Sequence, residues 1–162
     1  MFTRELLIMT RELVHICRDR DLTISTAESC TGGLIAACIT SVPGSSKVFD
    51  SGFCTYSNNA KIQTLGISNS VILNHGAVSK EVAIAMCENA IKKSNVDLTV
   101  AVTGIAGPGG GTKKKPVGTV EIASAYTKKT TIRKKFQFKG SREEIRLLTV
   151  KEAIIMLLNQ LK

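Results

Sequence analysis

Apolar side chains recur along this chain at two spacings, one typical of helices and the other of strands. Over residues 2–20 they follow the helical period, and residues 22–26 form a short β-prone segment. A run of small apolar residues at 34–39 predicts a second helix, and residues 49–56 predict a second strand. Helices and strands therefore alternate from the start of the sequence.

The same alternation continues to the C-terminus. Helices are predicted at 61–65, at 70–73, from Ser79 and from 140–141, and strands at 98–102, 117–126 and 130–138. The apolar core at 98–102 has the pattern of a central strand that is covered on both faces. A glycine-rich loop at 104–116 separates it from the last two strands, which are close enough in sequence to form a hairpin.

Helices that alternate with five strands define the fold class. We predict an α/β fold, a three-layer α/β/α sandwich with a mixed, mainly parallel five-stranded sheet. A chain of 162 residues can close such a core without disulfides or metals. Because no internal repeat or linker interrupts the pattern, residues 1–162 are expected to form a single domain.

The composition is that of a folded domain, with 43% hydrophobic and 22% charged residues. No apolar run approaches the ~18 residues that a membrane span requires, and the N-terminus has no signal-peptide pattern. The five cysteines form no CxxC pair, which favours reduced thiols over disulfides or a zinc site. We therefore expect a cytoplasmic protein with no bound metal or other cofactor.

The net charge of +9 comes entirely from the last third of the chain. Residues 1–112 hold nine basic and nine acidic side chains, whereas residues 113–162 hold thirteen and four. We expect the lysines at 113–115 and 128–135 to be mostly solvated. The excess charge is then better suited to attracting an anionic small molecule than to binding nucleic acid.

Three segments carry candidate chemistry, and the first, residues 26–33, follows a predicted strand. Within it Ser29 lies where the strand runs into a helix, at the sheet edge where α/β proteins usually bind ligands. Free backbone N–H groups at residues 30–33 could hold an oxyanion or a phosphate. The plainer interpretation is that Ser29 or Thr31 only caps the helix and that the glycines allow close packing.

The other two segments follow the second strand and the central strand. Residues 54–61 place Lys61 among apolar and amide side chains, although a solvated lysine at a helix start is the alternative. Residues 103–112 form either a loop that brings backbone amides to a ligand or a mobile surface loop. This loop lacks the Gly-Lys-Ser/Thr of a P-loop and the GxGxxG of a dinucleotide fold, so both nucleotide folds are poorly supported.

The two histidines limit the possible mechanisms. His15 and His75 belong to none of the three segments, which disfavours both a Ser-His-Asp triad and a histidine metal site. The nucleophile-elbow motif Gly-x-Ser-x-Gly is absent as well. If Ser29 is a nucleophile, the best available base is Lys61. Its pKa must then lie well below the usual value of about 10.4.

These segments and four further motifs together resemble a known family. The motifs are Thr-Ala-Glu-Ser-Cys-Thr-Gly-Gly (26–33), Val-Pro-Gly-Ser-Ser (42–46), Tyr-Ser-Asn-Asn-Ala-Lys (56–61), Gly-Ala-Val-Ser (76–79), Thr-Gly-Ile-Ala-Gly-Pro-Gly-Gly-Gly (103–111), Lys-Pro-Val-Gly-Thr-Val (115–120) and Gly-Ser-Arg-Glu-Glu-Ile-Arg (140–146). Over nearly the whole chain they resemble the CinA C-terminal domain family. Its enzymatically defined members are the PncC-type nicotinamide-nucleotide amidases (NMN deamidases).

The resemblance implies a metal-free Ser/Lys amidohydrolase that converts nicotinamide mononucleotide (NMN) to nicotinate mononucleotide and ammonia. It also implies an α/β/α fold that commonly forms a homodimer. The implied catalytic residues are the nucleophile Ser29, the base Lys61, Tyr56 as a group that assists or orients it, and Thr103 beside the reacting groups. The implied substrate-binding residues are Thr31, Gly32, Gly33, Ser46, Asn58, Gly107, Arg142 and Arg146.

Several alternatives stay open on the sequence alone. The chain could be a non-catalytic nucleotide- or DNA-binding module that uses its basic loop and hairpin, or an amidase acting on another small amide. Cys30 could be the nucleophile in place of its neighbour. Arg142 and Arg146 could form surface pairs with Glu143 or Glu144 instead of holding a phosphate.

Overall fold

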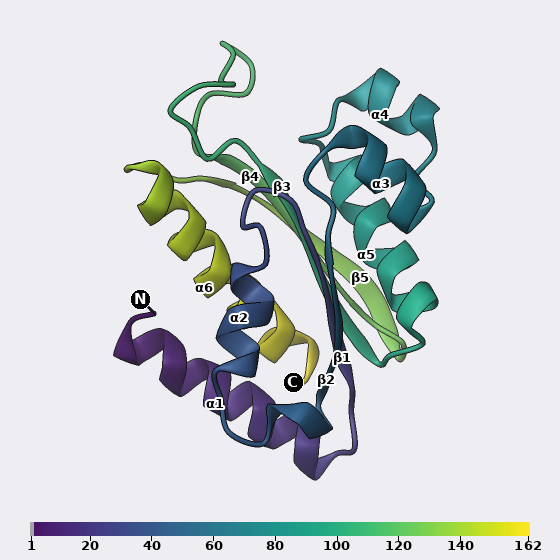
Figure 1. Cartoon of the computed structure of the whole chain (residues 1–162), viewed down its shortest axis with the longest axis vertical. Coiled ribbons are helices and arrows are strands. Elements are labelled where there is room, and N and C mark those ends of the chain that lie inside the picture. The colour runs from purple at the N-terminus through teal and green to yellow at the C-terminus, as the bar shows by residue number, and fades with distance from the viewer. Residues whose placement is uncertain (1) are drawn as a thin grey trace.

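A computed structural model describes residues 2–162, in which one sheet lies between two layers of helices (Figure 1). The strands are β1 (Ile24–Glu28), β2 (Phe49–Cys54), β3 (Leu98–Gly104), β4 (Thr119–Tyr126) and β5 (Lys129–Gln137). The helices are α1 (Arg4–Asp19), α2 (Leu34–Thr40), α3 (Asn58–Leu65), α4 (Asn69–His75), α5 (Lys80–Ser94) and α6 (Arg142–Gln160), with a short 3-10 helix η1 (Ser45–Lys47).

The strand order is β2-β1-β3-β4-β5. Strand β1 pairs in parallel with both β2 and β3, whereas the β3–β4 and β4–β5 pairs are antiparallel. Only β4 therefore runs against the other strands. Helices α1, α2 and α6 cover one face of the sheet, and α3, α4 and α5 lie on the other (Figure 1). The predicted three-layer sandwich with a mixed, mainly parallel sheet is confirmed.

The two faces of the central strand differ in side-chain size. On the side of α5, Ala27, Ala101 and Ala123 are partners in register across β1, β3 and β4, and all three are fully buried. Small side chains let α5 lie close to the sheet. On the opposite side, Val100 and Val102 belong to the larger apolar core beneath α6. Both faces are covered, which is why the segment is apolar throughout.

Helix α3 begins three residues earlier than the pattern predicts, at Asn58 rather than at Lys61. The reason is a cap: the Ser57 side chain accepts a hydrogen bond from the Ala60 amide at 3.0 Å, and so satisfies one of the free N–H groups at the helix start. Lys61 consequently lies at the end of the first turn instead of being the first residue of the helix.

The carboxyl ends of the parallel strands β1, β2 and β3 meet at one edge of the sheet. Ser29 follows β1 directly, Tyr56 comes just after β2, and Thr103 lies near the end of β3. This is the edge at which ligands bind in open α/β sheets. None of the helices between residues 2 and 162 is long and apolar enough to cross a membrane.

Candidate active site

Ser29 is fixed at this edge by the sheet itself. Its amide donates to the Val102 carbonyl at 3.1 Å, which extends the pairing of β1 with β3 beyond the end of β1. The chain then turns at Gly32 and Gly33, with φ values of 60° and 96°, before it enters α2. Residues with a Cβ rarely adopt these angles, so the glycines permit the tight turn beside Ser29.

The side chain of Lys61 reaches Ser29 from the first turn of α3. Its Nζ lies 2.9 Å from Ser29 Oγ, and it also donates to the carbonyl oxygens of Thr55 at 2.8 Å and Tyr56 at 3.2 Å. Only 1% of Lys61 is exposed. None of the ion pairs within residues 2–162 includes it. A lysine buried among neutral groups alone is rare, because an unpaired buried charge is costly.

Burial lowers the pKa of Lys61 below its ordinary value of 10.5, because the ammonium form loses its hydration. The three neighbours of Nζ suit a neutral amine. Its two N–H groups can donate to the carbonyls of Thr55 and Tyr56, and its lone pair then faces the Ser29 hydroxyl. In this form Lys61 can take the proton of Ser29 as a general base.

A cavity of about 190 Å³ opens above this pair. Of the residues implied by the family resemblance, the cavity is lined by Ser29, Tyr56, Asn58, Lys61, Thr103 and Arg142. Its other walls are Cys30, Ala77, Val78, Gly104 and Ala106. The fold thus gathers residues from both ends of the sequence around one small space.

Tyr56 contributes to the cavity through two different groups. Its backbone carbonyl accepts from Lys61 Nζ and lies 3.5 Å from Ser29 Oγ. The residue as a whole is 58% exposed, and the phenol oxygen accepts from Arg142 Nη2 at 2.9 Å. The orientation of Lys61 that the resemblance implies for Tyr56 is therefore carried by its main chain, while the phenol faces the mouth of the cavity.

Thr103 is 1% exposed, and its hydroxyl donates to the Ala77 carbonyl at 2.8 Å. This bond ties the segment between α4 and α5 to the end of the central strand. Since Ala77 also lines the cavity, Thr103 both borders the reacting groups and holds the opposite wall in place.

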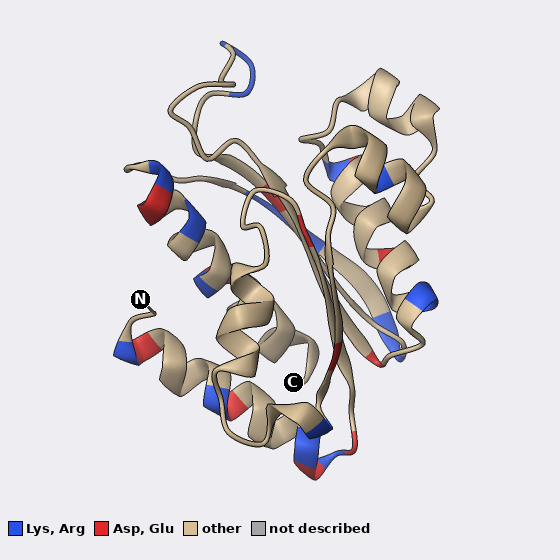
Figure 2. Cartoon of the chain, in the orientation of Figure 1, with Lys and Arg blue, Asp and Glu red and all other residues tan. Residues whose placement is uncertain are grey.

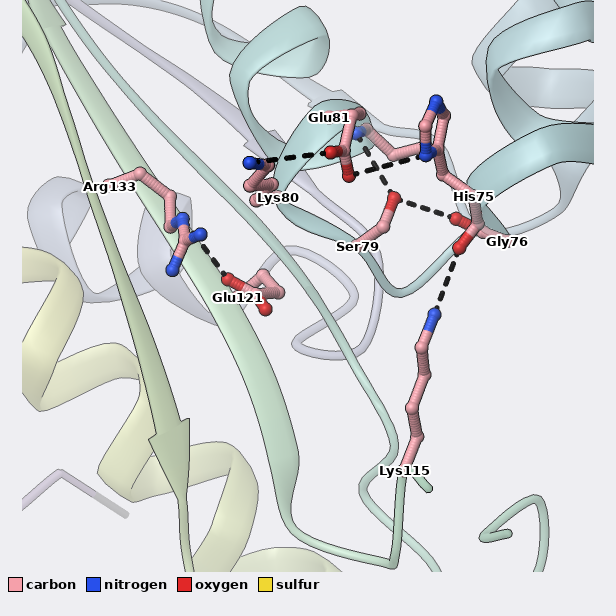
Figure 3. A network of polar contacts seen from close by, with 9 residues as sticks. His75, Gly76, Ser79, Lys80, Glu81, Lys115, Glu121 and Arg133 are labelled. Carbon is pink, nitrogen blue, oxygen red and sulfur yellow. Dashed lines mark hydrogen bonds and ion pairs between the residues drawn. The ribbon is translucent and has the colours of Figure 1, made fainter.

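A network of polar contacts supports that wall from outside (Figure 3). Lys115 Nζ donates to the His75 carbonyl at 2.9 Å, and the Ser79 hydroxyl donates to the Gly76 carbonyl at 2.8 Å. Ser79 also accepts from the Val82 amide and so caps α5. Lys115, expected among the solvated lysines, is instead half-buried and links the glycine-rich loop to the end of α4.

Arg142 and Arg146 both lie in the first half of α6 but have different surroundings. Arg142 Nη1 donates to the Gly107 carbonyl at 2.9 Å, so this residue connects α6, the glycine-rich loop and the Tyr56 phenol. Arg146 does not line the cavity, and its Nη2 donates to the Thr31 carbonyl at 2.7 Å. Within residues 2–162 neither arginine forms an ion pair, so the alternative of pairs with Glu143 or Glu144 is wrong.

The expected anion-binding role of the Gly32 and Gly33 amides needs correction. The Gly32 amide donates to the Ser29 carbonyl, and the Gly33 amide donates to Glu28 Oε2 at 2.9 Å. The hydroxyl of Thr31 donates to the same carboxylate oxygen at 2.6 Å. These groups already have acceptors, and in residues 29–36 only the Cys30 and Thr31 amides have none.

Sequence reasoning missed the role of Glu28. Its carboxylate is 1% exposed and accepts four hydrogen bonds, from the Thr31 hydroxyl and the amides of Gly33, Ile35 and Ala36. It therefore caps α2 from the end of β1. The available signal was an acidic residue at the end of an otherwise uncharged strand, shortly before a helix that has no Ser or Asp cap of its own.

Ser46 and Gly107 also lie outside the cavity. Ser46 is in η1, before the start of β2, and so lies at the opposite edge of the sheet. The length of β2, roughly 17 Å, separates that edge from the one at which Ser29 lies. The expectation that it binds substrate phosphate is wrong for a site within one chain. Gly107 takes part through its carbonyl, which accepts from Arg142 and is not a donor to an anion.

Cys30 is the rival nucleophile, and its environment argues against that role. Only 5% of it is exposed, and burial raises the pKa of its thiol to about 11. The reactive thiolate is therefore scarce at neutral pH. No group of three or more His, Cys, Asp or Glu side chains within residues 2–162 is placed to hold a metal ion.

The comparisons with known proteins identify the family of this chain. The CinA C-terminal domain profile matches residues 7–161. The chain belongs to the CinA C-terminal domain family. It is 53% identical over 139 residues to a CinA-like protein of Endomicrobium trichonymphae, a match that covers 86% of this chain and 32% of that protein. It is 58% identical over 111 residues to a putative competence-damage inducible protein of Symbiobacterium thermophilum, a match that covers 68% of this chain and 26% of that protein. The chain thus spans about a third of the length of these relatives.

Solved structures of the CinA superfamily have the same fold over nearly the whole chain. The competence/damage inducible protein CihA of Agrobacterium tumefaciens superposes with a TM-score of 0.96 at 41% identity, covering 98% of this chain and 97% of that one. A CinA superfamily protein of Escherichia coli superposes with a TM-score of 0.92 at 30% identity, and the match covers 99% of this chain and 94% of that one. The family that the motifs resemble is therefore confirmed, together with its fold.

Proposed function

We propose that this CinA-family domain is a Ser/Lys amidohydrolase that hydrolyses the carboxamide of NMN to nicotinate mononucleotide and ammonia. The observation that carries the proposal is the 2.9 Å contact between Ser29 Oγ and the buried Nζ of Lys61. A lysine with a lowered pKa beside a serine hydroxyl, in the lining of a cavity, is the arrangement that activates a serine nucleophile.

In the first half of the reaction, Ser29 Oγ attacks the carboxamide carbon while neutral Lys61 takes the hydroxyl proton. The carbonyl oxygen becomes an oxyanion, which requires N–H donors beside Ser29. The C–N bond then breaks as the protonated Lys61 returns the proton to the leaving nitrogen. Ammonia departs and the acyl group remains as an ester on Ser29.

In the second half, water attacks the ester carbonyl and Lys61 takes a proton from it. A second oxyanion forms in the same place and collapses, breaking the bond to Oγ. Lys61 returns the proton to Ser29, and the carboxylic acid product releases its own proton to solvent and leaves as the carboxylate. One base in one position therefore serves both halves of the reaction.

The size and surroundings of the cavity suit an amide that carries an anionic tail. About 190 Å³ is below the usual 300–1,000 Å³ of sites that enclose a drug-sized ligand, so only the carboxamide and its ring would enter. The ribose phosphate would lie outside, near the Arg142 guanidinium at the cavity mouth. Arg142 is exposed and free of carboxylate partners in the described chain, so a phosphate can compete for it.

The direct test is ammonia release by the purified protein from NMN, with nicotinamide riboside and nicotinamide as substrates that lack the phosphate. We expect NMN to be the best of the three by kcat/KM, and a chelator to leave the rate unchanged. No ammonia above the blank from NMN would contradict the proposed substrate. Turnover of other small amides in its place would support the more general amidase.

Arg142 provides a second prediction. Arg142→Gln is expected to raise KM for NMN about 10–100-fold with a smaller change in kcat, since a charge-assisted contact to phosphate contributes about 1.5–3 kcal/mol. Steady-state kinetics with NMN and nicotinamide riboside measure this, and the riboside KM should barely change. Lys134→Gln removes one exposed positive charge from β5 and is the matched control. Equal KM effects from both variants would show general charge steering instead of binding by Arg142.

A DNA-binding module is the competing proposal, in keeping with the competence-damage names of the relatives. Lys and Arg residues at the tip of the glycine-rich loop and along β5 favour it (Figure 2). It predicts binding that weakens steeply with salt. It does not account for a lysine buried against a serine within a cavity.

A further inference from the structure

The loop of residues 29–33, which follows the proposed nucleophile, is held from two sides. On one side the buried Glu28 carboxylate accepts from the Thr31 hydroxyl and from amides at the start of α2. On the other side Arg146 Nη2 donates to the Thr31 carbonyl at 2.7 Å. A Cβ placed on Gly32 would lie 3.6 Å from this same Nη2, so the guanidinium packs directly against the loop.

These contacts fix one peptide plane at both ends. The peptide between Thr31 and Gly32 has its oxygen held by Arg146, and its N–H donates to the Ser29 carbonyl at 3.1 Å. The plane that precedes it, between Cys30 and Thr31, cannot rotate freely when its neighbour is fixed. Its N–H and that of Cys30 are the two amides of this loop without an acceptor. Cys30 lines the cavity beside Ser29.

We propose that Arg146 is a positioning residue: by holding the Thr31 carbonyl, it keeps the Cys30 and Thr31 amides in place as the donors that stabilise the oxyanion. Glu28 is a second positioning residue, because it holds the loop from the opposite side through the Thr31 hydroxyl and the amides at the start of α2. This inference rests on the proposed serine mechanism and deepens it. It narrows the oxyanion donors, expected among the amides of residues 30–33, to those of Cys30 and Thr31, and it takes Arg146 out of direct contact with substrate.

The alternative role for Arg146 is binding of the substrate phosphate. A neighbouring cavity of about 430 Å³ is lined by both Arg146 and Arg142, and the buried Nε of Arg146 has no partner among the described residues. The two roles make opposite kinetic predictions. A positioning residue acts on the transition state and changes kcat, whereas a phosphate ligand acts on bound substrate and changes KM.

The experiment compares Arg146→Met and Arg146→Lys with the wild type, using NMN. We expect Arg146→Met to lower kcat about 10–100-fold with KM within about threefold, since loss of one oxyanion donor costs roughly 10²–10³ in kcat. Arg146→Lys keeps a donor for the Thr31 carbonyl and should recover part of the rate. Lys151→Met, which removes a positive charge of the same helix that pairs with Glu5 of α1, should change neither constant. A raised KM with unchanged kcat in Arg146→Met would overturn the proposal.

A fluorophosphonate probe separates this proposal from the choice of substrate. Ser29 Oγ attacks phosphorus while Lys61 takes the hydroxyl proton, the P–F bond breaks and fluoride leaves, and the phosphoryl oxygen takes the place of the oxyanion. We expect intact-mass analysis to show labelling of Ser29 in the wild type and at least about tenfold slower labelling in Arg146→Met. If labelling is slowed in Arg146→Met but the wild type does not hydrolyse NMN, the positioning role is supported and NMN is rejected as the substrate. Equal labelling rates would overturn the positioning role, and an unlabelled wild type would overturn both.

Glu28→Gln gives an independent test, because it loosens the loop without touching Arg146. The amide offers one oxygen where the carboxylate offered two, so it cannot accept all four hydrogen bonds. The same pattern of lowered kcat and unchanged KM is expected in protein that remains folded by circular dichroism. A folded Glu28→Gln variant with wild-type kcat would contradict the shared role of the two residues.

Discussion

Replacing Ser29 with alanine is expected to lower kcat for ammonia release by a factor of about 10⁴ or more while the fold is retained. The reason is that the hydroxyl, 2.9 Å from Lys61 Nζ, is the group placed to form the acyl intermediate, and removing the nucleophile of a serine hydrolase costs losses of this order. The substitution removes one oxygen from a side chain in the cavity, so little apolar packing is lost. Ammonia release and thermal unfolding of the two proteins measure both parts of the prediction.

Two controls make the result specific. Ser70→Ala removes an exposed hydroxyl from α4 and should leave kcat unchanged. Cys30→Ala removes the rival nucleophile and should cost far less than Ser29→Ala, because the buried thiol has a raised pKa. The opposite result, a loss of about 10⁴ in kcat for Cys30→Ala with activity retained in Ser29→Ala, would show that Cys30 is the nucleophile.

Lys61→Met is expected to lower kcat about 10³-fold or more. Methionine fills the space of the lysine stem but cannot take a proton from Ser29, and general-base catalysis contributes about 10²–10⁴ in rate. In the wild type, kcat/KM should rise with pH through a pKa below 10.5, as Lys61 becomes neutral. The pH–rate profile over the range in which the protein is folded measures that pKa.

The same lowered pKa predicts a pH-dependent difference in stability. Between the folded-state pKa of Lys61 and 10.5, the unfolded chain binds more protons than the folded one. The free energy of unfolding of the wild type, minus that of Lys61→Met, should therefore rise with pH across this window. Denaturant unfolding at several pH values measures it, with Lys92→Met, an exposed lysine of α5, as the control. A difference that stays constant up to pH 10.5 would show that burial does not lower the pKa of Lys61.

Much of the fold followed from local pattern. Residues 98–102 indicated a central strand because both of its faces are apolar, and the segments at 117–126 and 130–138 indicated a hairpin because a short connection joins two β-prone runs. The start of α3 was misplaced because propensity favours Lys61 over the two asparagines before it. The Ser57 cap overrides that preference.

The site was predicted unevenly, for physical reasons that differ from residue to residue. Ser29 was a candidate because it lies where a predicted strand runs into a helix, at the edge where parallel strands end, whereas Thr103 came from the family resemblance. Glu28 was missed because a carboxylate that accepts four hydrogen bonds cannot be told from a surface carboxylate by residue type. Ser46 was misassigned because a motif records nearness in sequence, whereas η1 lies at the opposite edge of the sheet.

By itself, the sequence determined the order and type of the elements, the family, and the residues able to carry the chemistry. Hydrophobic period and turn residues act over a few neighbours, so they can be recognised in the chain. Only the tertiary structure decided that Lys61 meets Ser29, 32 positions away, and that Arg146 holds Thr31, 115 positions away. It also decided that the pKa of Lys61 is lowered, because a pKa depends on the burial and partners that the packed layers create.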